Sequence, residues 1–227
     1  MKNYDLETAE YLSHGIGLFI AYMMGNDERS HIAEYVKIFQ PYGTIVDMGC
    51  GVGTTGELIK EFVPESKTIN VTNSEFQANY MAKHGRYFIQ SDYHDTGLAN
   101  EVADCVMFNE SFGYGNPEVL MAESSRILKD GGFLLMKDFT PINNPSEVIE
   151  MSGWEYFVYP LSRIISAAEK ANLKLIWAFN KDASVDRFVN FFFSSKMKDW
   201  HQNIHFPCNC ICMKFVKMPD NTHGVSQ

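Results

Sequence analysis

The sequence is poor in positive charge and contains no long apolar run. Lysine and arginine number 19 against 28 aspartate and glutamate residues, and the formal net charge is −9. Phosphate contacts need a basic face, so this balance argues against a nucleic-acid partner. The main apolar stretch near the N-terminus, "GIGLFIAYMMG" (residues 15–25), is too short to span a bilayer. With no recognisable secretory signal, we expect a cytoplasmic protein without a stable membrane anchor.

Cysteine is scarce, and its distribution does not suggest a disulfide framework. The chain has five cysteines, an odd number. Cys208, Cys210 and Cys212 alternate in "PCNCICMKF", which would place them on one face of a strand. Zinc sites favour C-x2-C pairs in turns, so we favour a buried strand face over a metal site.

The remaining composition is that of one globular domain. The chain has 227 residues, of which 45% are hydrophobic, and it shows no internal repeat. Alternating strand and helix patterns predict βαβ units. We therefore expect an α/β fold with a doubly wound, mostly parallel, seven-stranded Rossmann-like sheet in a single domain. Its expected parts are an N-terminal helical cap (1–40), a Rossmann-like core (41–217) and a tail (218–227). The sequence does not decide whether the protein forms a homo-oligomer.

Hydrophobic periodicity and turn residues place the individual elements. Helices are expected at 5–24 (interrupted by "HGIG"), 28–39 (with Ser30 as a cap), 53–62, 74–84, 117–129 and 159–171. Strands are expected at 43–49, 67–72, 86–92, 102–110, 131–139, 172–179 and 206–217. Residues 181–205 are expected to form either a lid or part of the core.

The segment "IVDMGCGVG" (residues 45–53) indicates a ligand site at the first strand-to-helix turn. Its glycines permit a tight turn and a close backbone approach, and the next helix points its N–H groups at a ligand. The spacing differs from the G-x-G-x-x-G of dinucleotide folds and lacks the G-K-S/T ending of a P-loop. The preceding apolar strand and Asp47 favour a ligand site over a plain structural turn.

At these residues the chain resembles the class I S-adenosylmethionine-dependent methyltransferases, whose first motif looks like "VLDIGCGTG". The resemblance extends over about residues 40–180, through "FIQSDYHDTG", "EVADCVMFNESFGY" and "ESSRILKDGGFLLMKDF". It implies methyl transfer with S-adenosyl-L-methionine as cofactor and S-adenosyl-L-homocysteine as product. The cofactor-binding residues that it implies in these motifs are Asp47, Gly49, Cys50, Gly51, Gly53, Asp92, Tyr93 and Asn109.

The second strand narrows the resemblance to one branch. A nucleotide site usually has an acidic residue at this strand end to bind the ribose, but "INVTNSEFQ" has Thr72 and Asn73 there. A pattern such as "GVTLSxxQ" is typical of cyclopropane fatty acid synthases, sterol C-methyltransferases and geranyl diphosphate C-methyltransferase-like enzymes. The branch implies that Thr72, Asn73 and Gln77 hold the ribose. We favour Gln77 over Glu75 because an amide offers both a donor and an acceptor.

The same branch suggests the catalytic residues. Glu110 in "FNES" is expected to stabilise a carbocation or to take its proton, the alternative being an exposed strand-end acid. "SHGIGLF" resembles the "HYGIG" segment that covers the cofactor in these enzymes. Tyr11 and His14 are therefore further candidates on the acceptor side, although His14 is equally compatible with a surface or packing role.

Aromatic and basic residues bear on the acceptor. Six aromatic residues in segments expected as loops suit an apolar or cationic acceptor, with core filling as the alternative: Phe112, Tyr114, Trp154, Tyr156, Phe157 and Tyr159. A diphosphate would need basic residues, and the candidates, none of them in a motif, are Arg126, Lys137, Arg163 and Arg187. The Cys and His pair with which cyclopropane synthases hold bicarbonate is not recognisable, which disfavours that activity.

The leading expectation is therefore C-methylation of a small isoprenoid or lipid-like alkene through a carbocation. N- or O-methylation of a small metabolite stays open. A non-catalytic cofactor-binding protein or a nucleic-acid modifier would belong to other classes. The intact glycine turn argues against the former, and "NESF" in place of a D/N-P-P-Y/F tetrad argues against the latter.

Overall fold

The computed structural model describes residues 3–13, 15–18, 20, 22–142, 149–151, 156–181 and 208–219. The main sheet contains β1 (Thr44–Met48), β2 (Lys67–Thr72), β3 (Phe88–Gln90), β4 (Ala103–Asn109), β5 (Leu128–Pro141), β8 (Leu173–Asn180) and β9 (Cys208–Lys217). Its strand order is β3-β2-β1-β4-β5-β9-β8. The first five strands are parallel, whereas β9 is antiparallel to both β5 and β8. The predicted doubly wound, mostly parallel seven-stranded sheet is confirmed.

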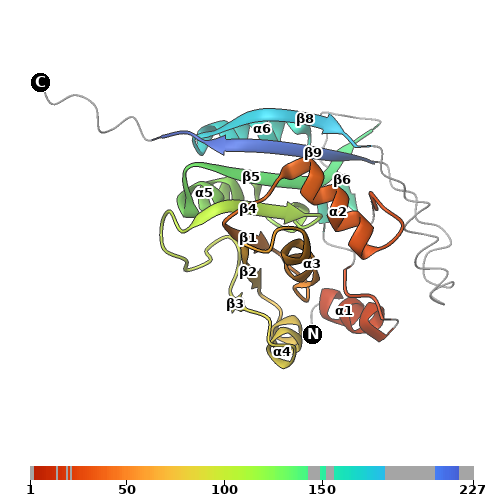
Figure 1. Cartoon of the computed structure of the whole chain (residues 1–227). Coiled ribbons are helices and arrows are strands. Elements are labelled where there is room, and N and C mark those ends of the chain that lie inside the picture. The colour runs from red at the N-terminus through yellow and green to blue at the C-terminus, as the bar shows by residue number, and fades with distance from the viewer. Residues whose placement is uncertain are drawn as a thin grey trace, which may run out of the picture.

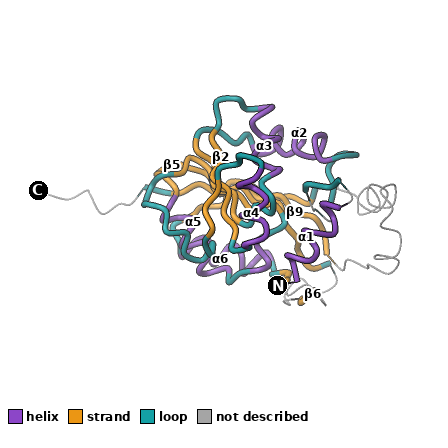
Figure 2. The backbone as a smooth tube through the Cα atoms, turned by 90° about the horizontal axis from the view of Figure 1, so that it is seen from below, coloured by secondary structure: helices purple, strands orange, loops and turns teal. Residues whose placement is uncertain are grey.

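Helices cover both faces of this sheet (Figures 1 and 2). They are α1 (Asn3–Ser13), α2 (Glu28–Phe39), α3 (Thr54–Phe62), α4 (Glu75–Lys83), α5 (Pro117–Ile127), α6 (Leu161–Lys170) and the short 3-10 helix η1 (Phe112–Tyr114). On the face covered by α2 and α3, here called the α2 face, Ile32 and Phe39 pack against Ile45 and Leu135. On the opposite face, covered by α5 and α6, Leu120 and Ile164 pack against Phe108. None of the described helices is long and apolar enough to cross a membrane.

The N-terminal helix is shorter than predicted. The expected helix over residues 5–24 is wrong beyond Ser13, where α1 ends and Gly15 adopts a positive φ of 76°. The backbone N–H groups of Gly17 and Leu18 donate instead to the Glu28 carboxylate, at 2.7 and 2.8 Å. An acidic side chain thus replaces the carbonyls that a continuing helix would supply.

The start of α2 agrees with prediction in position and differs in its cap. Asp27, not Ser30, is the N-cap, because its side chain accepts a hydrogen bond from the Ser30 N–H at 2.7 Å. The Ser30 hydroxyl oxygen in turn accepts from the Asp27 N–H at 3.0 Å. The two residues form a capping box, in which serine is the reciprocal partner.

A second, two-stranded sheet was not predicted. Residues expected as an aromatic loop contribute β7 (Tyr156–Val158), which pairs antiparallel with β6 (Ile149–Met151). The Tyr156 ring lies directly on Gly113 of η1, where an added Cβ would be 2.1 Å from the ring. This contact places the hairpin at the end of the sheet where β4 and β5 terminate.

Candidate active site

The glycine turn after β1 leaves space on one side only. Gly49, Gly51 and Gly53 have φ values of 77°, 56° and 79°, which glycine adopts without strain. A Cβ on Gly49 would lie 2.7 Å from the Ser111 side chain, so this glycine permits close packing against the end of β4. A Cβ on Gly51 would meet nothing nearer than the Tyr11 hydroxyl, at 3.8 Å. The open side therefore lies at Gly51, and the predicted site residue Tyr11 of α1 borders it.

The acid of the motif is buried beneath this turn. Asp47 is 2% exposed, and its Oδ2 atom has no hydrogen-bond partner among the described residues. Burial raises the pKa of this carboxyl to about 7. The adjacent Cys50 is buried too, and burial raises the pKa of its thiol. A cationic ligand group would complement the orphaned Asp47 oxygen.

The end of β2 is connected to α1 by a chain of hydrogen bonds. The Thr72 hydroxyl donates to Gln77 Oε1 at 2.6 Å, and Gln77 Nε2 donates to the Thr8 hydroxyl at 3.0 Å. Tyr11 also donates to this Thr8 oxygen, at 3.1 Å. The neighbouring Asn73 is exposed. Thr72 and Gln77 are thus brought together as predicted, while their contact with a ribose stays a prediction.

Asp92 and Tyr93 follow β3 and take up different positions. The Asp92 side chain is 58% exposed and accepts from the backbone N–H of His94, at 2.9 Å, while pairing with its ring Nδ1 at 2.6 Å. Tyr93 donates to the Ser111 carbonyl at 3.1 Å, and its ring lies beside Gly49. Sequence reasoning missed His94, although the spacing D-x-H is a signal for this local pair.

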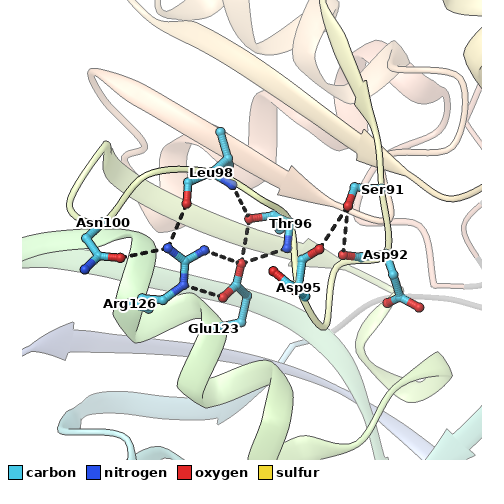
Figure 3. Close-up of polar contacts among 8 residues, drawn as sticks. All are labelled: Ser91, Asp92, Asp95, Thr96, Leu98, Asn100, Glu123 and Arg126. Atoms are coloured by element: carbon cyan, nitrogen blue, oxygen red, sulfur yellow. Dashed lines mark hydrogen bonds and ion pairs between the residues drawn. The ribbon is translucent and has the colours of Figure 1, made fainter.

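The loop that carries these residues is fixed from α5 (Figure 3). Buried Glu123 accepts from the N–H and hydroxyl of Thr96, at 2.9 and 2.6 Å. Arg126 binds the same carboxylate at 2.7 Å and also donates to the carbonyl of Leu98 at 2.7 Å and the side chain of Asn100 at 2.8 Å. The donors of Arg126, a residue considered for a diphosphate, hold this loop instead.

Glu110 is the centre of a buried polar cluster. It has a positive φ of 57°, and its backbone N–H donates to the Lys137 carbonyl at 2.8 Å. Its carboxylate accepts from the Tyr22 backbone N–H at 3.1 Å and forms an ion pair with Lys137. The two side chains are 5% and 0% exposed. The alternative of an exposed strand-end acid is therefore wrong.

The left-handed backbone at Glu110 explains this contact. Asn109 of β4, Lys137 of β5 and Cys212 of β9 are aligned across the sheet, and alternation places all three on the α2 face. A continuing strand would turn Glu110 to the opposite face. The buried Asn109 side chain lies beside His31 without a hydrogen bond of normal geometry.

Four aromatic rings follow one another from this cluster outward. Tyr22 contacts Phe139 at a centroid distance of 5.4 Å, Phe139 contacts Tyr156 at 5.5 Å, and Tyr156 contacts Tyr114 at 4.6 Å. We call these four residues the aromatic wall. Buried Asp138 fixes it, since its carboxylate accepts from the Tyr156 hydroxyl and from the Phe112 N–H at 3.0 Å.

The predicted aromatic residues divide between the wall, the core and the surface, and a role toward the acceptor stays a prediction. Tyr114 and Tyr156 belong to the wall, whereas Phe112 and Tyr159 fill the core and Phe157 is an exposed residue of β7. Tyr22 and Phe139 were missed, because the first was assigned to a helix and the second to the end of a strand. His14, Trp154, Arg187 and nearly all of the 181–205 segment lie outside the described residues.

The remaining cysteine and basic candidates have structural partners. Cys208, Cys210 and Cys212 are buried on β9, as predicted for one strand face. Among the described residues, no cluster of three His, Cys, Asp or Glu could hold a metal ion. Arg163 pairs with Glu118 at 3.2 Å on the surface.

Comparison with known proteins agrees with this geometry. Residues 46–136 match the family described as "Methyltransferase domain". Over 119 residues the chain is 33% identical to trans-aconitate 2-methyltransferases of Acidovorax sp. (strain JS42) and Acidovorax ebreus (strain TPSY), with 48% of this chain and 45% of each relative covered. The matched segment therefore spans less than half the length of these curated relatives.

The fold is similar to that of two solved structures. Geranyl diphosphate C-methyltransferase from Streptomyces coelicolor A3(2) superposes with a TM-score of 0.73 at 14% identity, covering 96% of this chain and 99% of that chain. The cyclase SpnF superposes with a TM-score of 0.79 at 14% identity, covering 95% and 94%. At such identities the likeness concerns the fold alone. Together with the match of residues 46–136 to a methyltransferase domain, it confirms the predicted resemblance to the class I S-adenosylmethionine-dependent methyltransferases.

Proposed function

We propose that this chain is an S-adenosylmethionine-dependent methyltransferase that methylates a carbon of an uncharged isoprenoid or lipid-like alkene. The observation that carries the proposal is the aromatic wall, which ends at the buried carboxylate of Glu110. Aromatic faces and a carboxylate both stabilise a carbocation in a site that excludes water. Ser111, next to Glu110, packs on Gly49, so the Glu110 end of the wall lies near the glycine turn.

The residues around the turn fit S-adenosylmethionine. Gly51 offers the open side, and Asp47 provides a buried carboxylate oxygen, Oδ2, without a hydrogen-bond partner among the described residues. In this assignment Asp47 and the turn hold the methionine portion, Gln77 the ribose and Asp92 the adenine amino group. When bound, the cofactor supplies an electrophilic methyl group on a sulfonium.

The chain then has to orient the acceptor and remove a proton. The alkene π electrons form the new carbon–carbon bond, while the electrons of the broken carbon–sulfur bond stay on sulfur. The acceptor becomes a carbocation, held between the aromatic wall and Glu110. Glu110 takes a proton from a neighbouring carbon, and that C–H electron pair forms the new double bond.

Charge supports an acceptor without a diphosphate. Of the four basic residues considered, Arg126 and Arg163 pair with glutamates of α5, and Lys137 pairs with Glu110. Arg187 lies outside the described residues. Arg126, Lys137 and Arg163 are therefore each already paired with a carboxylate.

A second candidate is O-methylation of a small carboxylic acid. The observation that favours it is the sequence similarity to trans-aconitate 2-methyltransferases. In that case Lys137 would bind the carboxylate of the acceptor, and its ion pair with Glu110 would have to break. The two candidates differ in the acceptor that they require, which makes them separable by one screen.

The test is a labelled-methyl transfer screen with purified protein. It compares isoprenoid alcohols, prenyl diphosphates, fatty acids, sterols, small carboxylic acids and amines. The proposal predicts a labelled methyl group bound to a carbon of an uncharged alkene. The label should be lost in Glu110→Gln, and also in Gly51→Arg, because the arginine side chain would fill the open side of the turn. Label only on oxygen or nitrogen would overturn carbon methylation. Failure to bind the cofactor in calorimetry would overturn the whole assignment.

A further inference from the structure

The buried ion pair of Lys137 and Glu110 is costly to form, because both charges are taken out of water. Both side chains are almost fully buried. A buried ion pair seldom stabilises a fold more than apolar packing would, so its presence calls for another explanation. Its position at the carboxyl ends of β4 and β5, where ligands of such sheets bind, suggests function.

The backbone is shaped to form this pair. Glu110 adopts a left-handed conformation that costs a non-glycine residue conformational energy, and such strain clusters at functional sites. The same conformation allows the N–H of Glu110 to donate to the carbonyl of Lys137 at 2.8 Å. Glu110 therefore contacts Lys137 twice, through a backbone hydrogen bond and through the ion pair of the two side chains.

We propose that Lys137 is a positioning residue, which keeps Glu110 ionised and oriented at the methyl acceptor in a site sealed from water. This inference rests on the proposed function of Glu110. A carbocation is a very strong acid, so a base that removes its proton needs to be ionised and in place rather than strongly basic. An ammonium partner at full burial meets this requirement.

Among the residues that the structure describes, Lys137 is the cation that pairs with Glu110. Other titratable groups face the pair from the segment before α2, from α2, from β5 and from β9; they are Tyr22, His31, Asp138, Cys208, Cys210 and Cys212. Burial lowers the pKa of His31 well below its usual range, so its ring is neutral. Burial disfavours the charged form of Lys137, but the Glu110 carboxylate outweighs it and raises the pKa of the ammonium.

The experiment compares Lys137→Met, Lys137→Arg, Glu110→Gln and the double variant Lys137→Met/Glu110→Gln. Labelled S-adenosylmethionine is the donor, and an isoprenoid alcohol or the acceptor that the screen identifies is the second substrate. In Lys137→Met, Glu110 loses the ammonium that favours its carboxylate form, so kcat at pH 7 falls about 100-fold and recovers toward pH 9. Lys137→Arg retains most activity and the wild-type pH profile. In the Glu110→Gln background, Lys137→Met changes the residual kcat less than about threefold, because it acts through Glu110.

A readout without activity separates this inference from the proposed function. Unfolding of Lys137→Met in urea should show stability that falls as pH rises from 5 to 9, because the folded state holds an uncharged Glu110 that must then ionise while buried. The double variant, with no such charge, should lack this slope and should remain measurable if Lys137→Met folds poorly. An unchanged pH profile of kcat together with an unchanged stability slope would overturn the inference. If Lys137→Met shows this pH dependence of stability but the wild-type protein transfers no methyl group, the effect of Lys137 on Glu110 stands and the proposed function is refuted.

Discussion

Protonation of Asp47 should control cofactor affinity. Burial raises the pKa of this carboxyl from 3.8 to about 7, and its Oδ2 has no partner among the described residues. The ammonium and sulfonium charges of S-adenosylmethionine favour the ionised carboxylate. We therefore expect the cofactor to bind the carboxylate form and to displace the proton that the free protein holds below pH 7.

The size of the effect follows from the pKa. At pH 5 about 1% of Asp47 would be ionised in the free protein, and at pH 7 about half. If only the carboxylate form binds, the dissociation constant falls about 50-fold between these pH values, which is about 2.3 kcal/mol, and levels off above pH 8. The direction is toward tighter binding with rising pH, because the group must lose a proton to bind.

Calorimetry in pairs of buffers with different ionisation heats measures this linkage directly. We expect nearly one proton released per cofactor at pH 5 to 6, about half a proton at pH 7 and almost none at pH 8.5. Asp47→Asn is the matched control, since it retains every other titratable group. Its affinity should be weaker and independent of pH. Equal wild-type affinity at pH 5 and pH 8, with the fold intact by circular dichroism, would refute the reasoning.

Three further predictions concern the walls of the site. Burial raises the pKa of Asp138 to about 6, so this group contributes stability that is present below pH 4 and is lost as pH rises through 6. Asp138→Asn should remove up to about 3 kcal/mol of this dependence in urea unfolding between pH 4 and 7, and identical slopes in the two proteins would contradict it. Gly113→Ala should destabilise the protein by about 1–3 kcal/mol, because its Cβ would overlap the Tyr156 ring, and denaturant midpoints will show whether that overlap is real. Gln77→Ala should weaken cofactor binding about tenfold. Thr8→Val, which removes the hydroxyl that accepts from Gln77 and Tyr11 but keeps the Gln77 side chain, should weaken it much less; equal losses would mean that Gln77 acts by holding α1.

Sequence could predict the parts of the site that are local. The strand, the glycine turn and α3 follow one another within residues 44–62, and each residue there is constrained by its neighbours. The Ser74 cap of α4 and the approach of Thr72 to Gln77 also lie within six residues. Such features depend on backbone propensity and short-range hydrogen bonds, which sequence patterns record.

The parts that could not be predicted are contacts between distant segments. Lys137 lies in the apolar run "FLLMKDF", where a lysine gives no sign of its partner 27 residues earlier. Its pairing with Glu110 also needs a left-handed residue that is not glycine, for which sequence offers no rule. Gln77 meets Thr8 across 69 residues in the same way, so its connection to α1 appears only in the folded chain.

The wrong prediction of a helix over residues 5–24 and the contact between Tyr22 and Glu110 have the same cause. In a helix over residues 5–24, the N–H of Tyr22 would donate to a carbonyl four residues earlier and could not reach Glu110. Because Glu28 takes the N–H groups of Gly17 and Leu18, the helix does not resume there, and the Tyr22 N–H is available as a donor. The segment that fails to form a helix thus supplies the Glu110 carboxylate with a hydrogen-bond donor and the aromatic wall with its innermost ring. Glu28→Gln, which weakens both acceptor contacts, should therefore lower methyl transfer more than cofactor binding, although Glu28 lies outside the reacting site.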